Sequence, residues 1–333
     1  MSIKLGINGL GRIGKLVLRL TLAQNNIEVV HINDMMNTEL MAHLLKYDSI
    51  HGKLNASVTF DDNHIIINDK PIRVTNATQP TEIPWEETGT EFVVDSSGRF
   101  KTYSTLEGHL KHGVKKVVLS CPPDDYSIER VVVMGVNQNT ILPSDRIISN
   151  ASCTTNCVAI MLKVLLNEFG IENAFMNTIH PTTNNQNLQD GYHSDYRRAR
   201  SAINNIIPTT SSAVRSVHRI FPELKEKFKG FATRIPILDC SDVGVCAMLQ
   251  KEVTRNDIIA AFQKYSSDPQ MCNFLEFTQD PIVSSDITDN PHSAIFDALA
   301  TQILGNRFIQ ILGWYDNEYG YSSRTIDLIN YIA

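Results

Sequence analysis

The sequence predicts an α/β protein, with a doubly wound parallel sheet in the first half and an α+β domain in the second. The chain opens on a β-branched apolar run, Ile3–Ile7, which glycines and a helix-spaced apolar pattern over Ile13–Leu22 follow directly. From about Ala174 the pattern changes to long β-like runs separated by turn-rich stretches. A chain of 333 residues also favours two domains, at roughly 100–200 residues each.

Strands and helices alternate in the first half. A second strand is expected over Ile27–Ile32, and helices are expected over Asn37–Tyr47 and Thr102–His112. This alternation implies parallel strands joined by crossovers. The remaining candidate strands are Val58–Phe60, His64–Ile67, Phe92–Val94, Val117–Leu119 and Val131–Met134.

The second half combines one strong helix with longer strands. Apolar spacing over Val158–Phe169 predicts a helix, and it places Cys153 at or just before the helix start. The polar stretch Pro181–Ile207 has no clear period and is expected to be a long loop. We therefore expect domains over residues 1–152 and 153–316, with a C-terminal helix in residues 317–333 that returns to the first domain. The expected strands are Ala174–Ile179, Gly230–Ile237, Gly244–Gln250 and Phe308–Trp314.

Composition excludes several classes of protein. The 30 Lys and Arg against 36 Asp and Glu give a net charge of −6, which argues against nucleic-acid binding through bulk charge. The sequence has no cleavable leader and no run of about 18 apolar residues, so neither secretion nor membrane insertion is expected. Its six cysteines form no dense framework, which favours reduced thiols and a cytoplasmic protein. No metal site is expected, because Cys153 and Cys157 have no second ligand pair at zinc-site spacing.

The first motif with a chemical meaning is the glycine pattern at Gly9, Gly11 and Gly14. It lies between a predicted strand and a predicted helix, and Asp34 follows twenty residues after Gly14 at the end of the next strand. In Rossmann domains such glycines allow a tight turn, close approach of the backbone to a pyrophosphate, and close packing of the helix. A carboxylate at Asp34 would accept from ribose hydroxyls and repel a 2′-phosphate, so NAD is preferred over NADP.

Cys153 and His180 are candidate reactive residues. A cysteine at a helix N-terminus lies near free backbone N–H groups, which are expected to lower the pKa of its thiol. Cys157 lies one turn further along the helix and is expected to be inert. His180 ends an apolar run, where a histidine could act as a base beside a thiol.

Five segments together make the chain similar to the phosphorylating glyceraldehyde-3-phosphate dehydrogenase family. The similarity covers nearly the whole chain in order, and its most specific part surrounds Cys153. It implies that Cys153 is the nucleophile, that His180 is the base, and that a thioester forms on Cys153. The five segments are Gly6–Gly14, Ser149–Cys157, Arg197–Arg200, Ile206–Pro208 and Trp314–Tyr321.

The resemblance also implies NAD as cofactor, a phosphorylated aldehyde and inorganic phosphate as substrates, and a homotetramer whose 181–207 loop lines subunit interfaces. The cofactor-binding residues that it implies, besides the motif glycines and Asp34, are Arg12, Ile13, Ser97, Ser120 and Asn317. The phosphate-binding residues that it implies are Thr183, Arg198 and Arg234 for the substrate, and Ser152, Thr154, Ser211 and Ser212 for the attacking anion.

Ser211-Ser212 departs from the family pattern, which usually has Thr-Gly at this turn. The added side chain lies near backbone that should approach an anion, so the sequence supports oxidation more strongly than phosphorolysis. Other segments are similar to erythrose-4-phosphate dehydrogenase, which hydrolyses its thioester, and some relatives use arsenate as the attacking anion. A semialdehyde dehydrogenase and an NAD-binding redox sensor are further alternatives. The phosphate-binding residues argue against both of these alternatives.

Overall fold

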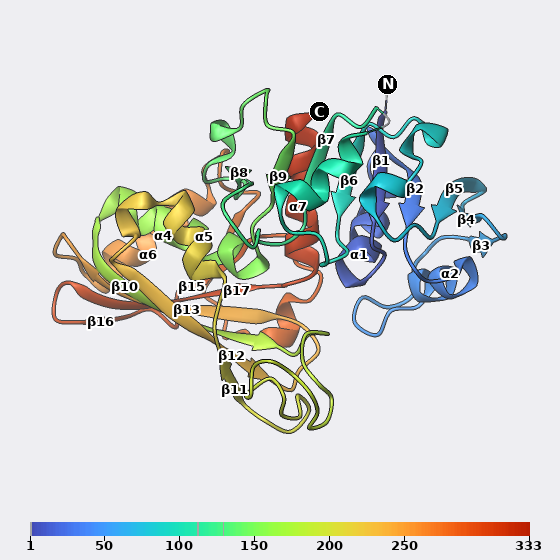
Figure 1. Cartoon of the computed structure of the whole chain (residues 1–333). Helices are drawn as coiled ribbons and strands as arrows, with labels where there is room; N and C mark the ends of the chain where they lie inside the picture. Colours follow the sequence, from blue (N-terminus) through green and yellow to red (C-terminus); the bar gives the residue numbers. More distant parts are fainter. Residues whose placement is uncertain (1, 112, 129) are drawn as a thin grey trace. The chain divides into compact units, whose positions relative to one another are not determined.

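The computed structural model describes residues 2–111, 113–128 and 130–333, and these form two compact units. The first unit runs to Val132 and adds Gln138–Ala151 and Ser322–Ala333. The second comprises Val133–Asn137 and Ser152–Tyr321. Each unit contains one sheet, and the two sheets differ in kind (Figure 1).

The sheet of the first unit has the strand order β3-β4-β5-β2-β1-β6-β7-β9-β8. Strand pairs from β5 to β8 are all parallel, whereas β3, β4 and β5 pair antiparallel. The chain builds outward on one side of β1 and then resumes with β6 on its other side. Ligands in such sheets bind at this reversal, beyond the carboxyl ends of the strands. The strands are β1 (Ile3–Asn8), β2 (Ile27–Asn33), β3 (Val58–Phe60), β4 (His64–Ile67), β5 (Lys70–Thr75), β6 (Phe92–Asp95), β7 (Lys116–Leu119), β8 (Arg130–Val131) and β9 (Ile147–Ser149).

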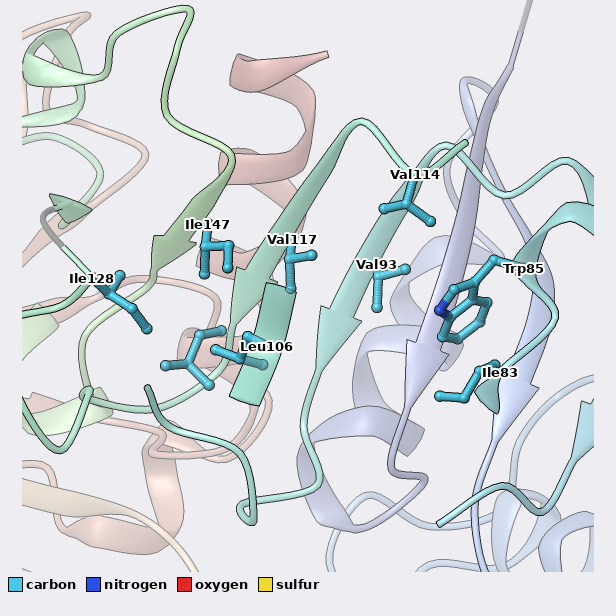
Figure 2. Close-up of a cluster of buried hydrophobic side chains, with 9 residues drawn as sticks. Ile83, Trp85, Val93, Leu106, Val114, Val117, Ile128 and Ile147 are labelled. Atoms are coloured by element: carbon cyan, nitrogen blue, oxygen red, sulfur yellow. The ribbon is translucent and has the colours of Figure 1, made fainter. Parts of the chain in front are cut away.

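A buried apolar row supports this sheet (Figure 2). Val93, Val117 and Ile147 come from the adjacent strands β6, β7 and β9, and Leu106 and Trp85 pack with them. Trp85 is fully buried. Burial of large apolar side chains stabilises the sheet by roughly 1.5–3 kcal/mol for each side chain.

The second unit holds a mixed sheet in the order β11-β12-β10-β13-β17-β15-β14, and β16 pairs with β17. The long strand β10 pairs parallel with β12 and antiparallel with β13. The strands are β10 (Ile171–Pro181), β11 (Ile207–Thr209), β12 (Phe228–Ile235), β13 (Ser241–Leu249), β14 (Leu275–Thr278), β15 (Ala294–Asp297), β16 (Gln302–Leu304) and β17 (Phe308–Tyr315).

Seven α-helices are present in the described residues. Helix α7 begins in the second unit and continues from Ser322 in the first, where Asn150 Nδ2 donates to Thr325 Oγ1 at 3.0 Å. None of the helices among the described residues is long and apolar enough to cross a membrane. The helices are α1 (Arg12–Thr21), α2 (Thr38–Lys46), α3 (Tyr103–Leu106), α4 (Cys153–Glu168), α5 (Ala213–Ile220), α6 (Arg255–Ser266) and α7 (Tyr319–Ile332).

The structure confirms the α/β class and corrects some elements. The expected strand Val131–Met134 is wrong, because β8 ends at Val131 and the chain turns toward Gly135, whose φ is +84°. The expected helix Thr102–His112 is instead α3 followed by a 3₁₀ turn over Glu107–Leu110, and His112 lies outside the described residues. As predicted, no helix or strand interrupts the chain between β10 and β11.

Candidate active site

Cys153 is the first residue of α4, as the sequence predicts. Ser152 caps this helix, because its Oγ accepts from the backbone N–H of Thr155 at 3.1 Å. Ala151, just before the cap, has a φ of +54°, a conformation that non-glycine residues seldom adopt. This tight turn brings the chain into α4 with the thiol at the helix start.

His180 lies near the end of β10 and reaches the Cys153 thiol. Its Nε2 is 3.5 Å from the Cys153 sulfur, and its side chain is buried. Its Nδ1 is 3.0 Å from the backbone carbonyl of Pro181. In the tautomer whose Nδ1 carries the proton, that proton goes to this carbonyl and Nε2 turns a lone pair toward the sulfur. The structure thus brings the two predicted reactive residues together.

Arg234 completes this group from β12. Its Nη1 contacts His180 Nδ1 and donates to the Pro181 carbonyl at 2.9 Å. No carboxylate in the described residues forms an ion pair with Arg234, so its charge is available for an anion. Burial lowers the pKa of Arg234, and the nearby Arg198 acts in the same direction. Two guanidinium groups in one place favour binding of a phosphate.

The protonation of this group differs from the sequence expectation. Burial raises the pKa of the Cys153 thiol, although Arg234 and the Thr154 backbone N–H act to lower it. The expected decrease is wrong because the Cys153 thiol is partly buried. The cost of removing a thiolate from water exceeds the benefit of the helix start. Burial, together with Arg234, lowers the pKa of His180 to about 3. The pair therefore rests as a neutral thiol and a neutral imidazole at neutral pH.

The other predicted anion ligands lie on two segments. Arg198 belongs to the long loop, and its Nε donates to Thr209 Oγ1 at 2.8 Å on the chain leading to α5. Ser211 Oγ accepts from the Ala213 N–H at 3.3 Å, so it takes part in the start of α5. Ser212 has a φ of −67°, and this turn consequently does not use the left-handed conformation that would need glycine. Thr183 is exposed after β10, and no hydrogen bond joins it to these residues.

Thr154 makes a different contact from the one expected of a phosphate ligand. Its side chain is buried, and its Oγ1 lies 2.9 Å from the hydroxyl of Tyr315. Tyr315 lies within a segment that carries the family resemblance, yet sequence reasoning gave it no role. On a strand over Phe308–Tyr315, Tyr315 shares one face with Ile309 and Ile311, and this spacing in the sequence could have placed it inward.

In the first unit, the glycine motif has the shape that a dinucleotide needs. Gly9 has a φ of +93°, and a Cβ there would lie 2.6 Å from the Ser97 backbone. A Cβ on Gly14 would lie 2.0 Å from the Gly9 carbonyl oxygen. A Cβ on Gly11 would meet nothing within 4 Å, and no side chain caps the start of α1. The backbone at the start of α1 therefore faces open space, which fits a pyrophosphate.

Asp34 supports this turn from the end of β2. One carboxylate oxygen accepts from the Leu10 N–H at 2.6 Å, and the other accepts from the Met36 N–H at 2.9 Å. Each oxygen keeps further acceptor capacity, which fits ribose hydroxyls. Arg12, at the start of α1, is paired with Asp48. Ile13 follows Arg12 in the same turn of the helix.

Buried Asp95 holds the two remaining predicted serines of this unit. Its carboxylate accepts from Ser97 Oγ at 2.7 Å, and its backbone carbonyl accepts from the Ser120 N–H at 2.9 Å. His109 Nδ1 accepts from Trp85 Nε1 at 3.2 Å, so His109 donates from Nε2 to the same carboxylate at 3.0 Å. Sequence reasoning missed this acid, although it ends the apolar run of β6.

Asn317 belongs to the second unit. Its side-chain Oδ1 accepts from Ser241 Oγ at 2.8 Å, which fixes the carboxamide. Cys157, one turn after Cys153, is fully buried, and burial raises the pKa of its thiol well above the usual value. This agrees with the prediction that Cys157 is inert.

Two family models match the chain. The model described as "Glyceraldehyde 3-phosphate dehydrogenase, NAD binding domain" matches residues 3–103, and the model of the C-terminal domain matches residues 152–317. The chain belongs to the glyceraldehyde-3-phosphate dehydrogenase family. The two models together cover the glycine motif, Cys153, His180 and Arg234.

Individual relatives match over the full length. A glyceraldehyde-3-phosphate dehydrogenase of Streptomyces coelicolor is 45% identical over 335 residues, covering 100% of this chain and 99% of the relative. Those of Priestia megaterium and Geobacillus stearothermophilus are each 43% identical over 334 residues, with the same coverage. This family membership identifies the chain as an NAD-dependent oxidoreductase that acts on an aldehyde group.

Proposed function

We propose that the chain oxidises glyceraldehyde 3-phosphate with NAD and inorganic phosphate, and that it releases 1,3-bisphosphoglycerate. The observation that carries this proposal is the group formed by Cys153, His180 and Arg234. A thiol lies 3.5 Å from an imidazole nitrogen, and the imidazole contacts a guanidinium that forms no ion pair with a carboxylate in the described part of the chain. This arrangement suits nucleophilic attack on an aldehyde that carries a phosphate.

In the first step, the Cys153 sulfur forms a bond with the aldehyde carbon. The thiol proton moves to His180 Nε2, which lies 3.5 Å from the sulfur, in the tautomer whose Nδ1 carries the ring proton. Burial and Arg234 disfavour a charged imidazole, so His180 passes this proton to the new alkoxide oxygen, which completes a hemithioacetal. The Cys153 N–H is among the helix-start groups that α-helical geometry leaves without an acceptor, and it can stabilise the developing oxyanion.

The second step removes two electrons from the hemithioacetal carbon. NAD, when bound, accepts them together with the carbon-bound hydrogen as a hydride. His180 Nε2 takes the hydroxyl proton at the same time, and the carbon becomes the carbonyl of a thioester on Cys153. We propose that Asn317 positions the nicotinamide carboxamide.

In the last step, a phosphate oxygen attacks the thioester carbon. The carbon–sulfur bond breaks, the acyl phosphate leaves, and the sulfur recovers a proton from His180. We propose that Arg234, Arg198 and Thr183 bind the substrate phosphate, and that the attacking phosphate binds at Ser152, Thr154, Ser211 and Ser212. The uncharged donors at the start of α5 support the second assignment.

Apart from Asn317, the cofactor-binding residues that we propose lie in residues 1–152, and the reacting residues lie in residues 153–316. Gly9, Gly11 and Gly14 would hold the pyrophosphate beside Arg12 and Ile13 at the start of α1. Asp34 would bind the adenosine ribose, and Ser97 and Ser120 would line the same edge of the sheet. The open space beside Gly11 and the free acceptor capacity of Asp34 support this assignment.

We also propose a cytoplasmic homotetramer in which the 181–207 loop contributes to subunit contacts. Large apolar side chains on this loop support the proposal, since Tyr192 is 97% exposed and Tyr196 is 89% exposed. Such side chains cluster where proteins associate. Sedimentation analysis of the wild-type chain should give four copies. A monomer at micromolar concentration would contradict the assembly.

The reaction is tested by NADH formation from glyceraldehyde 3-phosphate and from erythrose 4-phosphate, each with and without phosphate or arsenate. The proposal expects fast turnover on the triose that requires one of the two anions. Turnover that favours the tetrose and needs neither anion would instead identify a hydrolysing enzyme. Failure with both aldehydes would contradict the proposed oxidation.

A further inference from the structure

Four strand ends of the first unit are joined by their side chains. Thr75, Asn33, Asn8 and Asp95 are the last residues of β5, β2, β1 and β6, and these strands lie side by side in this order (Figure 1). Thr75 Oγ1 donates to Asn33 Oδ1 at 2.9 Å. Asn33 Nδ2 donates to Asn8 Oδ1 at 2.9 Å, and Asn8 Nδ2 donates to Asp95 Oδ2 at 2.7 Å. We call these four residues the polar ladder.

The hydrogen bonds of the polar ladder all run toward Asp95. Each of Asn33 and Asn8 accepts at its carbonyl oxygen from one neighbour and donates through its NH₂ group to the next. A second chain reaches Asp95 from the core. There, Trp85 Nε1 donates to His109 Nδ1, and His109 Nε2 donates to Asp95 Oδ2. Two rows of donors therefore end on one carboxylate.

The Asp95 carboxylate is fully buried, and both of its oxygens are paired. Oδ2 accepts from Asn8 and His109, and Oδ1 accepts from the Ser97 N–H at 3.1 Å and from Ser97 Oγ at 2.7 Å. An ionised carboxylate accepts through both oxygens and donates nothing, and these four donors match its capacity. Hydrogen bonds to a charged acceptor are about twice as strong as those between neutral groups. Asp95 therefore holds the end of β1 and the loop after β6 in one fixed arrangement.

The polar ladder lies directly before residues that we assign to NAD. Gly9 follows Asn8 in the chain, and Asp34 follows Asn33. The backbone of Ser97 lies so close to Gly9 that a Cβ on Gly9 would approach it to 2.6 Å. A shift of one strand end would consequently move a residue of the proposed cofactor site.

We propose that Asp95 is a positioning residue for NAD. It fixes the ends of β1 and β6 on the two sides of the reversal in the sheet, and through the ladder it also fixes the end of β2. This inference rests on the proposed cofactor site. Asp95 is fully buried, so it acts through Gly9, Asp34 and Ser97 and not by contact with NAD. A cofactor site that is less fixed before binding loses more conformational freedom on binding, which weakens affinity.

The first variant is Asp95→Asn in the full-length protein. Asparagine has nearly the shape of aspartate, but an NH₂ group that only donates replaces one of the two acceptor oxygens. Two of the four donors around residue 95 therefore lose their acceptor. We expect the dissociation constant of NAD, measured by calorimetric titration, to rise by at least about tenfold.

A matched control separates this effect from a general loss of stability. Val117 is fully buried in β7 of the same sheet, and its apolar side chain takes no part in the polar ladder. Val117→Ala should lower the melting temperature and leave NAD affinity unchanged. A similar weakening of NAD binding in Val117→Ala would overturn the inference, because lower stability alone would then explain the Asp95 result.

A pair of variants at His109 keeps the test decisive if Asp95→Asn does not fold. His109 is fully buried, so it can affect NAD only through its neighbours. His109→Leu removes one of the four donors to Asp95 and should raise the dissociation constant of NAD about three- to tenfold. His109→Gln keeps an N–H donor for Asp95 and should bind NAD more tightly than His109→Leu. Equal NAD affinities in the two His109 variants would overturn the inference.

The titrations need no aldehyde and leave Cys153 in place. Wild-type affinity in a folded Asp95→Asn protein would overturn the role of Asp95 and leave the proposed function standing. Absence of NAD binding by the wild type would contradict the proposed cofactor site, and this inference with it.

Discussion

His180 and Arg234 are register partners on the neighbouring parallel strands β10 and β12. Their side chains touch, and both reach the carbonyl of Pro181. This pairing fixes the imidazole with Nε2 directed at the Cys153 sulfur. Burial, and then the positive charge of Arg234, lower the pKa of the ring and keep it neutral. A substrate phosphate bound by Arg234 would thus lie next to the base.

Replacing Cys153 by serine should abolish aldehyde oxidation, with a loss of at least about 10³-fold in turnover. A hydroxyl in this position is a much weaker nucleophile than a thiol, and without the Cys153 sulfur no thioester can form there. NAD binding should persist, because the glycine motif lies in the other compact unit. Substantial turnover in the variant would remove Cys153 from the nucleophile role.

Alanine substitutions at two motif glycines should have different effects. A Cβ on Gly14 would meet the Gly9 carbonyl at 2.0 Å, so Gly14→Ala should lower the free energy of unfolding by about 1–3 kcal/mol. A Cβ on Gly11 meets nothing, so Gly11→Ala should melt like the wild type yet bind NAD about tenfold more weakly. Calorimetric titration and thermal melting measure both effects. Unchanged NAD affinity in Gly11→Ala would place the pyrophosphate elsewhere.

Replacing Asp34 by asparagine should narrow the preference for NAD over NADP by about five- to tenfold. The substitution removes the charge that repels a 2′-phosphate and weakens the acceptor for ribose hydroxyls. Its side-chain oxygen can still accept from the Leu10 N–H, and this should preserve the turn. The ratio of the two dissociation constants is the measurement. A ratio equal to that of the wild type would exclude Asp34 from the ribose site.

The pKa of His180 gives a stability prediction with a defined sign. The folded pKa of about 3 lies below the ordinary 6.5, so the unfolded chain binds an extra proton between these values. The contribution of His180 to stability is thus complete above pH 6.5 and is lost as pH falls toward 3. His180→Asn should flatten this decline by up to about 1.4 kcal/mol per pH unit. Urea unfolding at several pH values measures it, and parallel profiles for wild type and variant would contradict the assignment.

Most of the helices and strands that position the site can be predicted from the sequence. Strand β1, the glycine turn and helix α1 followed from apolar periodicity, and the start of α4 at Cys153 followed in the same way. Strands β3 and β4 match their expected bounds. These elements carry local signals, either a regular apolar period or a glycine at a turn.

The missed features depend on contacts between distant parts of the chain. Strand β5 begins with Lys70-Pro71 and lacks a continuous apolar run, and it is a strand because it pairs with β2 and β4. The raised pKa of Cys153 reflects partial burial by several elements, which no local pattern reports. The hydrogen bonds of the Tyr315 hydroxyl likewise join residues more than 130 positions apart.

The account's central claim is that oxidation leaves a thioester on Cys153 that phosphate must release. The most direct test mixes the enzyme with NAD and glyceraldehyde 3-phosphate without phosphate, and then measures NADH and the mass of the Cys153 peptide. We predict a burst of one NADH per chain and an acyl adduct on Cys153, and both should give way to continuous turnover when phosphate is added. Continuous NADH formation without phosphate and without an adduct on Cys153 would contradict the claim.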